Sequence, residues 1–325
     1  MKNNQTVVGI DVSKSSLDIF IFNNGSREHL KIDNCVKAIQ KFIDTLPSSS
    51  IVAMENTGRY NWYLYEVLAQ FSLSVYVLNP LHLKKSMGLI RGKNDKIDAS
   101  RIATYIAKNF DSHSKWMPPS KSIKTLQLLI SERKQRVNSI QKLKAINKEY
   151  GFVKTLGLSA DLTKMNNEQI NLLRIQIKAI EQQIKDLLSA DESLNEQLKL
   201  IKSVPGVGNI LAWHLIAKTQ GFSTIKDPRK LACYAGVVPF SNQSGVFKGK
   251  QRVSSYADKS LKSLLHLGAM SAIRLDNDLA AYYKRKVNEG KNKMSVINAV
   301  RNKMIHRVYA VLKNKNVYQN HLVMS

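Results

Sequence analysis

The sequence has few of the features that mark secreted or membrane proteins. It contains two cysteines in 325 residues, Cys35 and Cys233, so neither a disulfide framework nor a thiolate zinc site is predicted. No stretch reaches the apolar length of a membrane span. Asp11 interrupts the first apolar run, so residues 1–12 do not read as a secretory signal, and the seven histidines stand singly, without metal-ligand spacing. These absences predict a cytoplasmic protein with no membrane partner.

Acidic residues are also scarce. The chain has 24 Asp and Glu against 50 Lys and Arg, which gives a formal net charge of +26. A polyanion is the natural partner of such a protein, and in a bacterial cell this predicts association with the nucleoid. The positive charges are spread along the whole chain instead of lying beside an apolar segment, which disfavours a membrane surface. The alternative is a soluble protein that happens to be basic.

The first 112 residues show the pattern of an α/β domain. Three strands precede an alternation of helices and strands, which predicts a mixed sheet covered by helices. The Asn24–Gly25 pair marks a tight turn between the second and third strands. The predicted strands are residues 7–10, 17–22, 28–32, 51–54 and 74–78, and the predicted helices are residues 36–46, 60–71 and 95–109.

The rest of the chain is predicted to be mostly helical. Residues 113–200 form a helical connector, in which a coiled-coil seam steps by three and four residues: Ile170, Leu173, Ile177, Ile180, Ile184 and Leu187. The seam fits an intramolecular hairpin with residues 123–150 or a contact with another subunit equally well. A break at residues 205–208 opens a mostly α-helical C-terminal domain, residues 201–325, which a glycine-rich interval at residues 241–249 interrupts.

Four acids in the first domain form a candidate metal site. Asp11 and Glu55 end apolar strands, where a charge is costly unless it is compensated. Asp95 and Asp98 lie three residues apart, on one face of a helix. Carboxylates from two strands and a helix could converge on two Mg²⁺ ions, as phosphodiester chemistry requires. Each acid also has a structural explanation: Asp11 could begin a turn, Asp95 could cap the helix, and Asp98 could favour the helix dipole.

The segments around these acids resemble a known family. GIDVSKSSLD, AMENTGRY and KNDKIDASRIA are similar to the first-domain motifs of DEDD-type insertion-sequence transposases, which are related to the Piv invertase and are described as bridge-RNA-guided recombinases. The resemblance implies an N-terminal domain of the ribonuclease H and RuvC-like type. It assigns Asp11, Glu55, Asp95 and Asp98 as metal-binding catalytic acids. The residues Thr57–Gly58 and 99–101 match the flanking pattern.

The C-terminal segment carries two further motifs. Residues 203–208 resemble a helix-hairpin-helix turn, where Gly206 and Gly208 would let the backbone approach a phosphate; the alternative is a plain interhelical turn. Residues 234–239, followed by Gln243-Ser244-Gly245, resemble the second conserved domain of the same transposases. By that resemblance Ser244 is the catalytic nucleophile. Without it Ser244 is an ordinary loop serine, and no spacing identifies a base.

Several basic residues are candidates for nucleic-acid contacts, and a solvated charged surface is the alternative for each of them. They are Lys248, Lys250 and Arg252 beside the serine, and Lys134, Arg136, Lys142 and Lys144 on the connector. One departure puts the local phosphate or RNA contacts in doubt: the family commonly shows Ser-Lys-x-Gly and then Leu-Arg, whereas this chain has Ser254-Ser255-Tyr256-Ala257 and then Leu261-Lys262.

The sequence therefore predicts a transposase or site-specific recombinase of an insertion sequence. The resemblance implies a phosphoserine intermediate on Ser244, Mg²⁺ as the cofactor, donor and target DNA as substrates, and a guide (bridge) RNA encoded by the element. It also implies a dimer that assembles to a tetramer, with the acids of one subunit facing the serine of another. The first alternative is a RuvC-like, metal-dependent endonuclease that uses water, in which Ser244 is dispensable.

Two other classes of protein explain the sequence less well. An actin-like sugar or acetate kinase also opens with Gly-x-Asp, but it does not explain the Asp95/Asp98 pair or the charge, and the chain has no later glycine-rich phosphate loop. A non-catalytic nucleic-acid-binding protein would explain the charge but would leave four acids at the ends of strands and a helix without a purpose.

Overall fold

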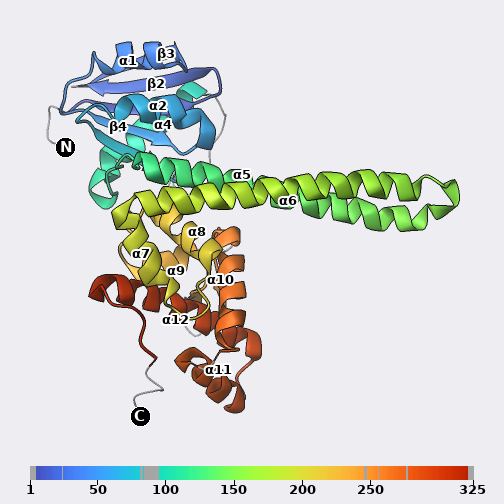
Figure 1. The fold of residues 1–325 in the computed structure, drawn as a ribbon. Coiled ribbons are helices and arrows are strands. Elements are labelled where there is room, and N and C mark those ends of the chain that lie inside the picture. The colour runs from blue at the N-terminus through green and yellow to red at the C-terminus, as the bar shows by residue number, and fades with distance from the viewer. Residues whose placement is uncertain are drawn as a thin grey trace. The chain divides into compact units, whose positions relative to one another are not determined.

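Figure 1 shows the computed structural model of the protein, which describes residues 5–23, 25–80, 83, 95–244, 247–254, 256–275 and 277–320. The chain divides into two compact units, Met1–Pro118 and Pro119–Ser325. The helical connector packs with the C-terminal segment in the second unit, and whether it acts as a separate domain stays a prediction. None of the helices in the described ranges is long and apolar enough to cross a membrane.

The first unit is built on a mixed five-stranded sheet in the order β3-β2-β1-β4-β5. The strands are β1 (Val7–Val12), β2 (Ser16–Asn23), β3 (Ser26–Asp33), β4 (Ile51–Glu55) and β5 (Ser74–Leu78). β1 is antiparallel to β2 and parallel to β4, so it is the central strand and has neighbours on both sides. The predicted α/β domain with a mixed sheet is confirmed.

Helices cover the two faces of this sheet. They are α1 (Val36–Ile43), the 3₁₀ turn η1 (Gly58–Asn61), α2 (Trp62–Leu68), α4 (Asp95–Asn109) and the 3₁₀ turn η2 (Phe110–Ser112). The even-numbered residues of β1, such as Val8 and Ile10, are buried in one core with α1 and α2. Gly9 faces the other way: a Cβ there would lie 2.3 Å from the Ala99 carbonyl oxygen of α4. Because side chains alternate along a strand, Asp11 lies on the α4 face.

The second unit begins with a long helical hairpin, α5 (Lys121–Glu149) and α6 (Ser159–Ala190), whose ends are joined through the 3₁₀ turns η3 (Tyr150–Phe152) and η4 (Lys154–Leu156). The two helices lie side by side along their length (Figure 1). Arg133 of α5 pairs with Glu181 of α6 at 2.7 Å. The seam residues Ile180 and Ile184 are buried in the same core as Ile130 of α5. The seam is therefore occupied within the chain, which answers the question that the spacing left open.

The remainder of the second unit is mostly helical, as predicted. Its helices are α7 (Glu192–Lys202), α8 (Asn209–Thr219), α9 (Pro228–Tyr234), α10 (Lys259–Ala272), α11 (Asp278–Asn288) and α12 (Lys293–Asn314). The glycine-rich interval is not an open loop. It lies in an antiparallel pair, β6 (Pro239–Ser244) and β7 (Phe247–Val253), with a register shift between Phe240 and Asn242. An irregularity of this kind allows glycine-containing segments to pair as strands.

Candidate metal and nucleophile sites

Asp11 occupies the middle of the sheet, one residue before the end of β1, and its side chain is half-buried. It shares the α4 face with Gly9, whose missing Cβ allows α4 to approach β1 closely. The two acids of the KNDKIDASRIA motif, Asp95 and Asp98, are in the first turn of α4. The close approach of α4 therefore places the strand acid near the helix acids.

The electrostatics of Asp11 show that the acids interact. Burial and the negative charges of Asp95, Asp98 and Glu55 together raise the pKa of Asp11 to about 6, against a backbone hydrogen bond from Val12 that lowers it. Since these neighbours disfavour ionisation of Asp11, a cation bound there would compensate its charge. Carboxylate oxygens are the ligands that Mg²⁺ prefers. Within the described ranges, no three acids, histidines or cysteines as placed lie close enough to hold a metal ion.

Glu55 ends β4, and a turn built on Asn61 fixes the chain after it. Asn61 is fully buried; its side-chain amide donates to the Glu55 carbonyl oxygen at 2.9 Å and accepts from the Thr57 N–H at 2.9 Å. The Thr57–Gly58 part of the motif is thus a structural turn that sets the direction of the chain beyond Glu55. Asn61 was not among the predicted residues, because its role depends on contacts that spacing does not reveal.

The two helix acids differ in their surroundings. Asp98 is half-buried and accepts a hydrogen bond from Arg101 at 2.8 Å, an ion pair between residues three apart on α4. Asp95 is exposed at the first residue of the helix. Arg101 therefore orients the carboxylate of Asp98, and Asp95 is exposed. Asp95 is a residue of the helix and not its N-cap, so that alternative is wrong. Asp98 lies in the first turn, where the helix dipole favours negative charge, and this explanation is compatible with metal binding.

A fifth acid on this face was missed. Asp18 of β2 lies directly opposite Asp11 in the strand register and is 4% exposed. It contacts His29 at 3.0 Å and Lys31 at 3.5 Å, both on β3. Asp18 is thus paired with two basic side chains of β3, whereas the charged neighbours of Asp11 are acids. A charged residue within the apolar run of residues 17–22 was the available signal.

Ser244 is the last residue of β6 and lies opposite Phe247 of β7. Gly245 lies outside the described residues, and so do the side chains of Ser244, Lys248, Lys250 and Arg252. The three basic residues occupy alternate positions of β7. The acids belong to the first unit and the serine to the second. That the acids and the serine act in one active site is therefore a proposal.

Gly206 and Gly208 differ in what surrounds them. Gly206 has a φ of +83°, and a Cβ there would lie 2.2 Å from the carbonyl oxygen of Gly268 on α10. Its lack of a side chain is explained by helix packing, the structural alternative for this turn. A Cβ on Gly208 would meet open space, and Gly208 caps α8 without a side-chain hydrogen bond. Only Gly208 presents the open helix N-terminus that a phosphate contact needs.

The basic residues predicted on the connector all lie on α5. Arg136 bonds Glu132 at 2.8 Å and Gln176 of α6 at 3.0 Å, so it stabilises the hairpin. Lys134, Lys142 and Lys144 are exposed, and none of them forms an ion pair within the part of the chain that the structure describes. They remain candidates for contact with a polyanion.

Comparison with known proteins gives two family matches. Residues 8–148 match the family DEDD_Tnp_IS110, described as a transposase, and residues 198–284 match the family described as "Transposase IS116/IS110/IS902 family". The first match covers Asp11, Glu55, Asp95 and Asp98, and the second covers Ser244.

Individual relatives extend over almost the whole chain. The pilin gene-inverting protein of Moraxella bovis is 26% identical over 98% of this chain and 99% of its own length. The transposase for insertion sequence element IS1111A of Coxiella burnetii is 23% identical over 96% of this chain and 91% of its own length. Among solved structures, T. thermophilus RuvC in complex with a Holliday junction substrate matches 34% of this chain and 96% of its own, with 16% identity and a TM-score of 0.26. The two family matches identify the chain as a DEDD transposase of the IS116/IS110/IS902 family, an enzyme that cleaves and transfers DNA strands.

Proposed function

We propose that this transposase cleaves and rejoins DNA through a covalent intermediate on Ser244, with Mg²⁺ bound by Asp11, Glu55, Asp95 and Asp98. The observation that carries the proposal is the raised pKa of Asp11. Burial and three neighbouring acids raise this pKa to about 6. A half-buried carboxylate with acids around it is stabilised by a divalent cation, and carboxylate oxygen donors suit Mg²⁺.

The chemistry assigns different roles to the two sites. Bound divalent cations would supply charge stabilisation on the attacking and leaving oxygens. The Ser244 hydroxyl forms a bond to phosphorus as the bond to the departing strand oxygen breaks; the serine loses a proton and the departing oxygen gains one. Attack by a strand hydroxyl on the phosphoserine then rejoins DNA and releases the serine, so no ATP is needed. Arg101 keeps the Asp98 carboxylate oriented during both steps.

The proposal includes the partners implied by the family resemblance. Donor and target DNA are the substrates, a guide RNA encoded by the element selects them, and a dimer assembles to a tetramer in which the acids of one subunit act with Ser244 of another. The net charge of +26 supports a large polyanionic partner. The likeness to pilin gene-inverting proteins favours rejoining over cleavage alone, since inverting a segment requires both ends to be rejoined.

The second candidate function is a metal-dependent endonuclease that uses water. It needs the four acids but not Ser244, and the DEDD match over residues 8–148 is compatible with it. The two functions differ in one product, which is a protein–DNA adduct.

The test is recovery of that adduct. The full chain is incubated with Mg²⁺, the noncoding RNA that flanks the gene, and matching DNA, and protein-linked DNA is isolated under denaturing conditions. We expect an adduct with the intact protein and with Ser241→Ala, a matched change in the same strand. We expect none with Ser244→Ala or Asp11→Ala. DNA cleavage by Ser244→Ala without an adduct would establish the water-using nuclease. An adduct that forms equally well without RNA would refute the role of a guide RNA.

A further inference from the structure

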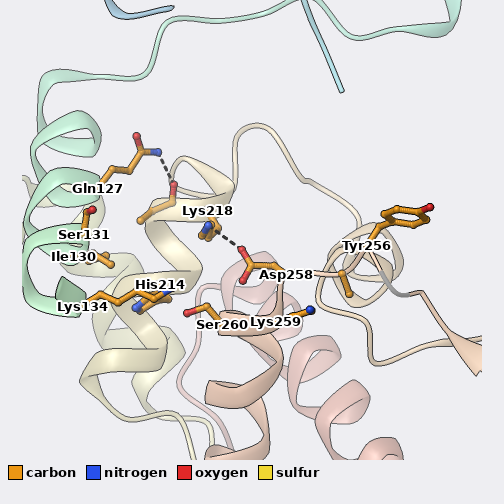
Figure 2. A pocket seen from close by; sticks show the side chains of 12 residues that line it. Gln127, Ile130, Ser131, Lys134, His214, Lys218, Tyr256, Asp258, Lys259 and Ser260 are labelled. Carbon is orange, nitrogen blue, oxygen red and sulfur yellow. Dashed lines mark hydrogen bonds and ion pairs between the residues drawn. The ribbon is translucent and has the colours of Figure 1, made fainter. Parts of the chain in front are cut away.

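The second unit contains a cavity of about 650 Å³ that the strand-transfer chemistry does not use. It lies between α5, α8 and the first turn of α10, and Tyr256 stands at its edge (Figure 2). Its volume is within the range of sites that hold small molecules or parts of larger ligands. Residues from three separate segments of the chain line it, so it is a product of the fold and not of one motif.

An ion pair anchors one side of the cavity. Asp258, the N-cap of α10, accepts from the Leu261 N–H at 2.9 Å and from the Tyr234 hydroxyl at 3.1 Å, and Lys218 of α8 lies 2.8 Å from its carboxylate. Figure 2 shows the Lys218 ammonium directed at Asp258. These two charges compensate each other, so the positive charge available to a ligand comes from the exposed lysines Lys134 and Lys259.

His214 lines the cavity and has a polar atom without a partner in the part of the chain that the structure describes. His214 is 9% exposed, and its Nδ1 is buried with no hydrogen-bond partner among the described residues. Burial, with the positive charge of Lys218, lowers the pKa of His214 to about 4, so the ring is neutral near pH 7. A buried polar atom without a partner is costly, and a ligand that reaches it recovers that cost. Figure 2 shows the Ser260 hydroxyl on the side of His214 and Lys134.

These groups have one property in common, which is that they can donate hydrogen bonds to an anion. The ammonium of Lys134, the hydroxyl of Ser260 and the imidazole of His214 are all potential donors. The N–H groups of Lys259 and Ser260 are in the first turn of α10, before the helix satisfies its own donors. A helix N-terminus with lysines beside it suits a phosphate group.

We propose that this cavity binds a backbone phosphate of a nucleic-acid strand, through Lys134, His214, Ser260 and the first turn of α10. The inference rests on the nucleic-acid partners of the proposed function but not on its covalent chemistry. Tyr256 is 65% exposed at the edge and offers a face on which the neighbouring base stacks. The strand is DNA or guide RNA, which share this phosphate chemistry.

The cavity is distinct from the site of strand cleavage. The segment 256–260, which lines the cavity, follows β7 in the chain. The last residue of β7, Val253, is paired with Pro239 at the start of β6. Five residues of strand separate Pro239 from Ser244, which is roughly 16 Å. Ser244 therefore lies at the other end of the β6–β7 pair from the residues that lead into the cavity, and the phosphate held in the cavity positions the strand.

The experiment measures binding in EDTA, so that no cleavage occurs. Fluorescence anisotropy gives the Kd of the full chain for short single strands of DNA and RNA with the same sequence. Lys134→Ala is compared with Lys148→Ala, which removes the same charge from an exposed position on the same helix that is not a candidate nucleic-acid contact. Tyr256→Ala is compared with Tyr256→Phe, which keeps the ring. Because Lys134 and Tyr256 are exposed, melting temperatures are expected to match those of the intact protein.

We expect Tyr256→Ala to weaken binding about tenfold, as loss of one stacked base does, and Tyr256→Phe to leave it within about twofold. Lys134→Ala is expected to weaken binding about fivefold more than Lys148→Ala. Strands carrying 5-iodouracil should crosslink to the segment around Tyr256, and the strand that crosslinks, DNA or RNA, identifies the source. Equal losses for both lysine variants, with no crosslink at this segment, would overturn the proposal. Failure of the intact protein to form the Ser244 adduct, while these binding losses are still measured, would instead count against the proposed covalent function alone.

Discussion

Replacing Asp11 by asparagine is expected to stabilise the protein when no divalent cation is present. Asp11 is half-buried and surrounded by three other acids, so its ionised form is unfavourable in the folded state. Asparagine has nearly the same size and removes the charge. A gain in stability on removal of a charge is expected where charges are gathered for function at the expense of the fold, as we propose for Asp11.

The magnitude follows from the pKa. A rise from 3.8 to about 6 corresponds to about 3 kcal/mol if the whole shift acted on stability, at about 1.4 kcal/mol per unit. Since the carboxyl is only half-buried, solvent screening reduces this to about 1–1.5 kcal/mol. The folded protein binds a proton more readily than the unfolded chain, so the wild type loses stability as pH rises from about 4 to 6. The advantage of Asp11→Asn is full above pH 6 and vanishes below about pH 4.

The assay is urea unfolding in EDTA at pH 7.5 and pH 4, followed by hydrogen exchange of peptides from β1 and β2, which reports on the first unit alone. Mg²⁺ should reverse the order by stabilising the wild type, because a cation that binds the native state adds to its stability. Asp18→Asn is the control: it removes the partner of His29 and Lys31 from a buried site and should cost about 1–3 kcal/mol. An Asp11→Asn variant that is less stable than wild type at pH 7.5 in EDTA would refute the reasoning.

Two further predictions concern packing and capping. Gly9→Ala should destabilise the first unit by about 3 kcal/mol, because its Cβ would lie 2.3 Å from the Ala99 carbonyl oxygen; increased hydrogen exchange of α4 measures this, and unchanged exchange would mean that α4 shifts freely. Asn277→Ala should cost about 1–2 kcal/mol, because the buried side chain accepts two N–H groups at the start of α11; urea unfolding gives the value, and a loss within error would show that solvent replaces the cap.

Much of the first unit could be predicted from the sequence, because its central strands are short continuous apolar runs and its helices have apolar residues at helical spacing. The short motifs around the acids predicted a DEDD transposase, and the family match over residues 8–148 confirmed it. Asp18 was missed, since its position opposite Asp11 depends on the pairing of β1 with β2, and single-strand periodicity contains no register. The same limit applies to Asn61, whose contacts are made after the turn has formed.

The second unit was harder to predict for a different reason. A heptad pattern on α6 is the same whether its partner is α5 or another chain, so only the fold selects the hairpin. Gly206 fitted a phosphate-binding turn by spacing, yet its close neighbour is Gly268, more than sixty residues away in sequence. The cavity likewise combines Lys134, His214 and Ser260, which no local motif connects. Ser244 itself depends on resemblance and its role stays a proposal.

The α5–α6 hairpin is held by the rest of the second unit at one end only. Along α5 the buried side chains are Ile123, Leu126 and Ile130, and Gln127 is tied to α8 by a hydrogen bond of 2.9 Å to the Ala217 carbonyl oxygen. From Ile130 to Glu149 the helix extends about 28 Å further, supported by α6 and the turns at its tip. A tilt of about ten degrees at the clamp would therefore move the tip by about 5 Å, close to one helical turn. The free end can follow a target that shifts by that amount while the clamped end, with Lys134 beside it, stays in register with the core.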